Sequence, residues 1–86
     1  MAEIIIYTTT YCPYCVRAKD LLARKGQKDI SEIDVTESDD LRVEMMQKSG
    51  GRRTVPQIFI NGTHVGGFDD LAALDSKGDL DSLLGA

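Results

Sequence analysis

Two cysteines are the residues of this chain with the most distinctive chemistry. Cys12 and Cys15 are its only cysteines and lie three positions apart. Two cysteines cannot build the multiple cross-links of a disulfide-rich secreted scaffold. With His64 as the single histidine, they also cannot complete a four-ligand zinc site within one chain. Their spacing leaves a redox pair, half of a metal site shared between chains, or coincidence, and it favours the redox pair.

The residues around the cysteines predict how such a pair would work. A β-branched and aromatic run over residues 3–8 indicates a buried strand, and Pro13 then favours the first position of a helix. Unpaired N–H groups in a first helical turn stabilise a thiolate. We therefore expect Cys12 to be the exposed nucleophile and Cys15, one turn further on, to be the resolving thiol. No metal is expected at this site.

A second cluster of chemically suggestive residues follows the last predicted strand. Gly66 and Gly67 allow close approach of a ligand backbone, and the helix predicted to begin at Phe68 offers free N–H groups to a carboxylate. The acidic pair Asp69 and Asp70 is also explained by helix capping alone. His64, in the preceding hairpin, is interpreted as structural or incidental because no second ligand is spaced to join it.

The elements that must position these residues are short and alternate in type. Hydrophobic patterns predict strands over 3–8, 30–35, 55–60 and 63–65. Helices are predicted from Pro13 to a stop at Gly26, from the acidic cap over 36–39 to 49–51, over 68–74, and as a last turn or two over 79–84. The order β-α-β-α-β-β-α, with a hairpin at Asn61-Gly62, predicts an α/β fold with a four-stranded mixed sheet flanked by helices.

Length and composition fit one small globular domain over residues 1–86. The chain is 42% hydrophobic and 28% charged, which argues against a disordered tail. Ten basic against 14 acidic residues give a net charge of −4, which disfavours a dedicated nucleic-acid binder. The longest aliphatic run is Ile4-Ile5-Ile6, so no membrane segment is expected. With no signal-peptide pattern, we expect a cytoplasmic protein.

Three motifs in the right order give a specific resemblance. Cys12-Pro13-Tyr14-Cys15, then Thr54-Val55-Pro56, then 66–71 (Gly-Gly-Phe-Asp-Asp-Leu) resemble the short bacterial type of dithiol glutaredoxin, in the thioredoxin-like fold. The resemblance runs from Ile4 to at least Leu74. It implies a monomeric, glutathione-dependent thiol–disulfide oxidoreductase that reduces protein disulfides and glutathionylated cysteines. Glutathione would be the co-substrate, and ribonucleotide reductase is a protein substrate expected from the family.

The resemblance also implies where glutathione binds. The Val55–Pro56 bond is expected to be cis, with the Val55 backbone pairing with the cysteinyl part of glutathione like an added strand. The γ-glutamyl carboxylate is expected at the backbone of Asp69 and Asp70, and its ammonium at the Asp70 side chain. The glutathione contacts expected from the family motifs are Tyr14, Thr54, Val55, Pro56, Gly67, Phe68, Asp69 and Asp70.

One feature departs from the family pattern. Many glutaredoxins carry a lysine shortly before the first cysteine, where it supports the thiolate and pairs with the glycyl carboxylate of glutathione. Here Thr9 is expected at that position, and the first basic residue of the chain is Arg17. Arg52 and Arg53 are the expected replacements, with Gln57 as a neutral contact to the glycyl carboxylate.

Two other functions fit part of the pattern. A dimer could hold a [2Fe–2S] cluster between Cys12 of each chain and two glutathiones, although Pro13 disfavours it because cluster-binding relatives tend to have a smaller residue there. A redoxin reduced directly by a flavoenzyme would use the same dithiol. The segment from Gly66 to Asp70 speaks against that interpretation because it suits a γ-glutamyl group.

Overall fold

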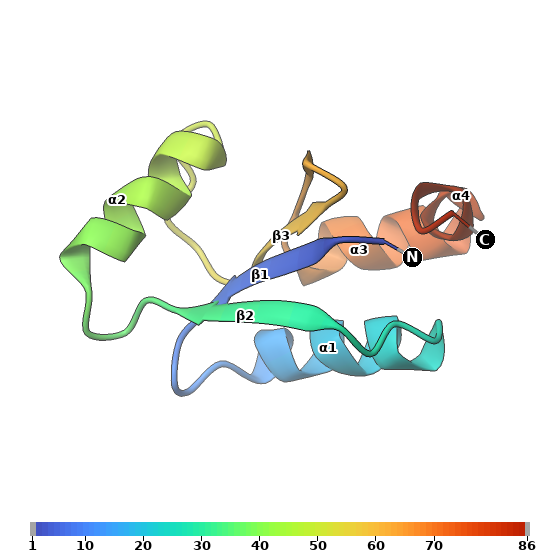
Figure 1. The fold of residues 1–86 in the computed structure, drawn as a ribbon, viewed down its shortest axis with the longest axis horizontal. Coiled ribbons are helices and arrows are strands. Elements are labelled where there is room, and N and C mark those ends of the chain that lie inside the picture. The colour runs from blue at the N-terminus through green and yellow to red at the C-terminus, as the bar shows by residue number, and fades with distance from the viewer. Residues whose placement is uncertain (1, 86) are drawn as a thin grey trace.

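A four-stranded mixed sheet forms the centre of the computed structural model, which describes residues 2–85 (Figure 1). The strand order is β2-β1-β3-β4. The predicted sequence of elements is confirmed, with the last helical turns forming a short helix of their own. The elements are β1 (Ile4–Thr8), α1 (Pro13–Arg24), β2 (Ile30–Asp34), α2 (Asp39–Lys48), β3 (Gln57–Ile60), β4 (Thr63–Gly66), α3 (Phe68–Ser76) and α4 (Asp79–Leu83).

The strand pairing follows from the connections. β1 and β2 are parallel because α1 joins them as a crossover, and Thr8 pairs with Asp34 at their shared end. β3 is antiparallel to β1 and forms a hairpin with β4. The hairpin turn has positive φ at both central residues, Asn61 at 51° and Gly62 at 81°, as a type I′ turn requires.

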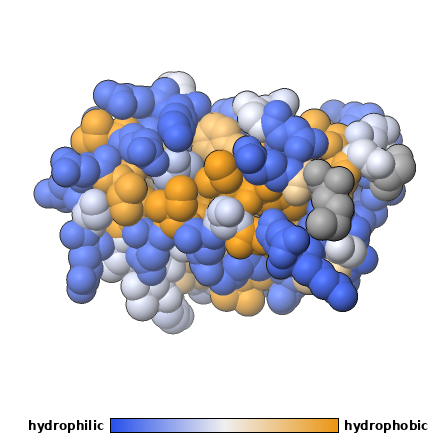
Figure 2. Space-filling view, in the orientation of Figure 1, coloured by the Kyte–Doolittle hydropathy of each residue, from blue (hydrophilic) through white to orange (hydrophobic). Residues whose placement is uncertain are grey.

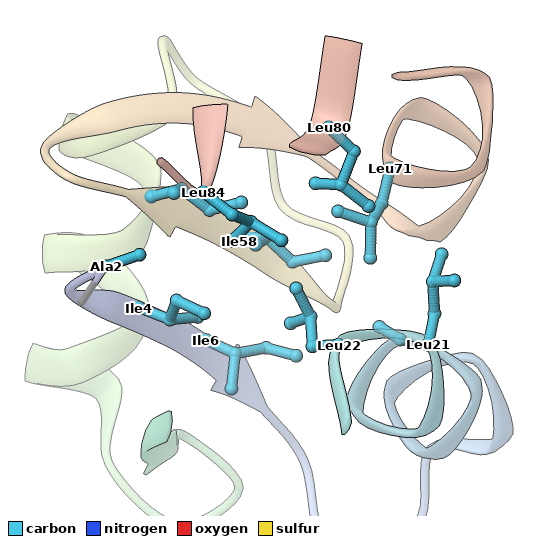
Figure 3. Packing of buried hydrophobic residues seen from close by; sticks show 11 residues of the cluster. Ala2, Ile4, Ile6, Leu21, Leu22, Ile58, Leu71, Leu80 and Leu84 are labelled. Atoms are coloured by element: carbon cyan, nitrogen blue, oxygen red, sulfur yellow. The ribbon is translucent and has the colours of Figure 1, made fainter. Parts of the chain in front are cut away.

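The larger core lies between the sheet and the helices α1, α3 and α4. Ile4 and Ile6 alternate onto this face of β1 and are at most 1% exposed. Figure 3 shows side chains from the sheet and from these helices converging there. Each fully buried Leu or Ile contributes about 1.5–3 kcal/mol of hydrophobic stabilisation. This packing fixes α1 and α3 against the sheet, and it therefore fixes where their first turns lie. The cluster comprises Ala2, Ile4, Ile6, Ala18, Leu21, Leu22, Ile58, Ile60, Leu71, Leu80 and Leu84.

A smaller core lies where α2 meets the sheet. Tyr7, Val35 and Met45 are its buried members, and partly buried residues such as Phe59 pack against it. In Figure 1, α2 lies on the opposite side of the strands from α1. Ser38 begins α2 by accepting a hydrogen bond from the backbone N–H of Leu41 at 3.2 Å. Figure 2 shows hydrophilic residues over most of this view and a hydrophobic band across its middle.

The third strand begins later than its hydrophobic pattern predicts. The pattern predicts one strand over residues 55–60, but β3 begins at Gln57. Pro56 has no N–H to donate to the sheet, so the ladder starts after it. Val55 and Pro56 are thereby left in the segment that leads into β3. Within residues 2–85, none of the helices has the length and apolar character needed to cross a membrane.

Candidate active site

Cys12 and Cys15 form a disulfide at the start of α1. Cys12 is the N-cap residue, with extended backbone, and its Sγ accepts a hydrogen bond from the Cys15 N–H at 3.1 Å. Pro13 occupies the first helical turn, where its missing N–H costs nothing. Cys12 is half-buried, whereas Cys15 is only 2% exposed. The structure thus gives the two sulfurs unequal access to a substrate.

A hydrogen-bonded network holds the loop that precedes Cys12. The Thr10 N–H donates to the Thr36 hydroxyl at 2.7 Å, and the Thr10 hydroxyl donates to Asp34 at 3.1 Å. Asp34 also accepts from the Thr36 N–H at 2.8 Å. The hydrogen bonds from Thr36, supplemented by the one from Thr10, lower the pKa of Asp34. Sequence reasoning missed this network. Parallel pairing of β1 with β2 was the available signal, because it brings the ends of both strands together.

The expected glutathione contacts come together in one groove. It has a volume of about 240 Å³ and is built by three segments: the start of α1, residues 52–56 before β3, and the start of α3. The predicted cis bond between Val55 and Pro56 is confirmed. The rings of Tyr14 and Phe68 lie 6.3 Å apart between their centroids. The groove is lined by Tyr14, Arg52, Thr54, Val55, Pro56, Gly67, Phe68, Asp69 and Asp70.

The two arginines proposed to replace the missing lysine lie in different places. Arg52 lines the groove and forms an ion pair with Asp70, with 3.2 Å between Nη1 and Oδ2. Arg53 is exposed and is not among the groove-lining residues. Thr9, at the position expected for the lysine, is half-buried, and its hydroxyl donates to the Tyr11 carbonyl at 3.2 Å. A basic side chain is therefore present in the groove, but it faces the start of α3.

Gln57 does not reach the groove. It is fully buried, and its amide nitrogen donates to the carbonyl of Thr54 at 3.0 Å and to the Thr54 hydroxyl at 3.2 Å. Its amide oxygen lies 2.8 Å from Nε2 of His64. The structure thus turns the Gln57 side chain into the protein, and Gln57 is not among the residues that line the groove. His64, interpreted from the sequence as structural, is linked through Gln57 to the groove segment.

A disulfide at the first turn of a helix, beside a groove with a cis-proline wall, defines a thiol–disulfide oxidoreductase of the thioredoxin-like class. Residues 4–65 match the family model described as Glutaredoxin, and the chain belongs to the glutaredoxin family. This family membership confirms the predicted thioredoxin-like fold. It also makes the chain a glutathione-dependent dithiol oxidoreductase. A [2Fe–2S] cluster-binding dimer is not better supported than this dithiol function.

Relatives from bacteria and a plant agree with this assignment. The chain is 55% identical to a glutaredoxin of Pseudomonas aeruginosa over 86 residues, which cover 100% of both chains. It is similar to the solution structure of a glutaredoxin from Brucella melitensis, with 58% identity, a TM-score of 0.82, and coverage of 98% of this chain and 89% of that one. A buckwheat glutaredoxin solved in complex with glutathione has a TM-score of 0.86 and 31% identity, covering 98% of this chain and 77% of that one.

Proposed function

We propose that Cys12 is the attacking nucleophile, that Cys15 is the resolving thiol, and that the groove beside them binds glutathione. The observation that carries the proposal is that the two cysteines of the disulfide differ in their exposure to solvent. Cys12 is half-buried at the N-terminus of α1, and Cys15, in the first turn of the helix, is 2% exposed. When the pair is reduced, the first-turn N–H groups, including that of Cys15, stabilise negative charge on the Cys12 sulfur.

Reduction of a protein disulfide uses both cysteines. The Cys12 thiolate attacks one sulfur of the substrate disulfide, and the other substrate sulfur leaves as a thiolate. The Cys15 thiolate then attacks the Cys12 sulfur of the mixed disulfide and releases the second substrate thiolate. The substrate gains two electrons, and the enzyme is left with the Cys12–Cys15 disulfide. Two glutathione molecules restore the dithiol and leave as glutathione disulfide.

A glutathionylated protein needs Cys12 alone. The Cys12 thiolate attacks the glutathione sulfur, the protein thiolate leaves, and glutathione becomes disulfide-bonded to Cys12. A second glutathione thiolate then attacks the bound glutathione sulfur. Glutathione disulfide forms, and the Cys12 thiolate is released. In this proposal the groove holds the tripeptide while its sulfur is bonded to Cys12.

Three segments of the groove suit three parts of glutathione. The backbone of Val55 pairs with the cysteinyl residue as an added strand would. The first turn of α3, at Asp69 and Asp70, receives the γ-glutamyl end because its N–H groups favour a carboxylate. Thr54, Pro56 and Gly67 complete the walls, and the rings of Tyr14 and Phe68 flank the bound peptide. The buckwheat glutaredoxin solved in complex with glutathione supports the binding of glutathione by this chain.

Single-cysteine variants test the roles. Cys12→Ser is expected to abolish reduction of both a protein disulfide and a glutathionylated peptide, because it removes the nucleophile of both paths. Cys15→Ser is expected to keep deglutathionylation and to lose dithiol reduction of the protein disulfide. The two activities are measured by coupling glutathione disulfide formation to glutathione reductase. Retained deglutathionylation by Cys12→Ser would contradict the assignment.

Four finer expectations belong to the same proposal. The chain acts as one domain and as a monomer, because all three segments of the groove and both cysteines come from one chain. It works in the cytoplasm, where glutathione keeps thiols reduced. Ribonucleotide reductase is proposed as a protein substrate from the family resemblance. Light scattering tests the monomer, and glutathione-dependent turnover of the oxidised reductase tests the substrate.

A further inference from the structure

An ion pair forms part of the lining of the proposed glutathione groove. Arg52 comes from the segment after α2, and Asp70 comes from the first turn of α3, 18 positions later. Their closest atoms, Nη1 and Oδ2, are 3.2 Å apart. The same Oδ2 accepts the Gly67 N–H at 3.0 Å. The hydrogen bond from Gly67, together with the Arg52 guanidinium, lowers the pKa of Asp70, so this carboxylate is charged at neutral pH.

The backbone beneath the pair fixes its position. Gly66 is buried with φ of +114°, and a Cβ at this residue would collide with the Asp70 carboxylate and lie 2.6 Å from Nη1 of Arg52. Nη2 of Arg52 lies 3.8 Å from the point where a Cβ of Gly67 would stand. The buried Ser49 hydroxyl donates to the Arg52 carbonyl at 3.1 Å. Both charged groups are thus held directly over the glycine pair.

Each member of the pair keeps bonding capacity for a ligand. The Arg52 side chain is 43% exposed and that of Asp70 is 47% exposed, and both line the groove. Among residues 2–85, Arg52 donates from Nη1 to Asp70, and its Nη2 and Nε have no hydrogen-bond partner. Oδ1 of Asp70 likewise accepts no hydrogen bond from the described residues. The groove therefore presents an adjacent donor fork and acceptor oxygen.

A neighbouring cation and anion match a ligand with the opposite charges on adjacent groups. The α-amino acid end of the γ-glutamyl residue is such a ligand, because it carries one ammonium and one carboxylate on the same carbon. The glycyl end of glutathione carries a carboxylate only. Arg52 also offsets the charges of Asp69 and Asp70 in the groove, and without it an anionic tripeptide would meet two carboxylates and no cation.

We propose that Arg52 determines specificity for the γ-glutamyl end of glutathione: its guanidinium binds the α-carboxylate together with the first-turn N–H groups of α3, while the Asp70 side chain binds the α-ammonium, as the family resemblance implies. The proposal rests on glutathione binding in this groove. It places Arg52 at the opposite end of the tripeptide from the glycyl carboxylate that the missing lysine would have bound. Arg52 and Asp70 together select a thiol partner that carries an amino acid zwitterion.

Arg52→Gln tests this with Arg53→Gln as the matched control, because Arg53 is the adjacent arginine and does not line the groove. The substrate is a short peptide whose cysteine is disulfide-bonded to glutathione or to one of two analogues. One analogue, 4-aminobutyryl-cysteinyl-glycine, lacks the γ-glutamyl carboxylate. The other, γ-glutamyl-cysteine ethylamide, lacks the glycyl carboxylate. Michaelis constants are measured for each substrate, and a cysteamine mixed disulfide serves as a reference without either end.

Arg52→Gln is expected to raise KM about tenfold for glutathione, as loss of one charge-assisted contact predicts. The same rise is expected for the ethylamide analogue, and no rise for the 4-aminobutyryl analogue. Arg53→Gln should match the wild type throughout, and Arg52→Lys should recover part of the loss.

A defect that persists on the 4-aminobutyryl analogue and disappears on the ethylamide would place Arg52 at the glycyl end. That result, or no defect on any substrate, would overturn this inference alone. If the wild type had no lower KM for glutathione or its analogues than for the cysteamine reference, the proposed function would be overturned instead.

Discussion

The buried side chain of Gln57 is bonded twice to Thr54. Its amide nitrogen donates to both the carbonyl and the hydroxyl of that residue, at 3.0 and 3.2 Å. Thr54 lines the groove and immediately precedes the cis Val55–Pro56 bond. The amide oxygen of Gln57 faces His64, whose ring also lies 4.9 Å from that of Phe59. Gln57 therefore positions a groove residue from inside the protein and does not itself line the groove.

Gln57→Ala is expected to weaken both folding and glutathione binding. Thr54 loses two hydrogen bonds and His64 loses one, and the loss of intramolecular hydrogen bonds such as these costs about 1–3 kcal/mol in all. We expect the free energy of unfolding in urea to fall by that amount and KM for a glutathionylated peptide to rise, with kcat less affected. Gln47→Ala is the matched control, because Gln47 is exposed on α2. Equal KM values for the Gln57 and Gln47 variants would show that Gln57 does not position Thr54.

Gln57 also shows why part of the site could not be predicted from the sequence. The run over residues 55–60 indicates a strand, and its alternation correctly puts Ile58 and Ile60 on the main core. Gln57 lies on the opposite face of β3, where it is the register partner of Tyr7 on the neighbouring strand β1. Whether that face is buried depends on how α2 packs, which no local pattern encodes. From sequence alone, a polar residue beside the groove motif therefore resembles a ligand contact.

The motifs themselves were predictable because their geometry is local. Pro13 begins α1, so the placement of Cys12 at its N-cap needs only the sequence. The direction of the Arg52 side chain, toward Asp70, was not predictable. It depends on where the segment after α2 passes the first turn of α3. The bonds of Asp34 to Thr10 and Thr36 likewise depend on the parallel pairing of β1 with β2.

The Asp34 network predicts a pH dependence of stability. Because its pKa is lower in the folded protein than in the unfolded chain, the carboxylate stabilises the fold above its ordinary pKa of about 4. That stabilisation is lost as the pH falls through the lowered pKa. Asp34→Asn keeps the shape and removes the charge. We expect its thermal midpoint to lie below the wild type at pH 7 and the difference to shrink to zero in acid.

The matched control for Asp34→Asn is Asp29→Asn, one residue before the same strand. Asp29 is exposed, and its side chain makes no hydrogen bond or ion pair with the residues that the structure describes. Its thermal midpoint should follow the wild type from pH 7 into acid. A difference between Asp34→Asn and the wild type that stays constant as the pH falls would mean that the charge of Asp34 contributes nothing.

Gly66→Ala separates backbone strain from the position of the ion pair. A positive φ costs an ordinary residue about 1–2 kcal/mol. Gly62 has φ of +81°, and nothing lies within 4 Å of the point where its Cβ would stand, so Gly62→Ala reports that strain alone. At Gly66 the added methyl also collides with the ends of the Asp70 and Arg52 side chains, which can swing aside into solvent. We therefore expect both variants to lose at least this much stability, and only Gly66→Ala to raise KM for glutathione substrates, because the pair no longer lies over Gly67. Equal KM values in the two variants would show that glutathione binding does not depend on where Arg52 and Asp70 meet.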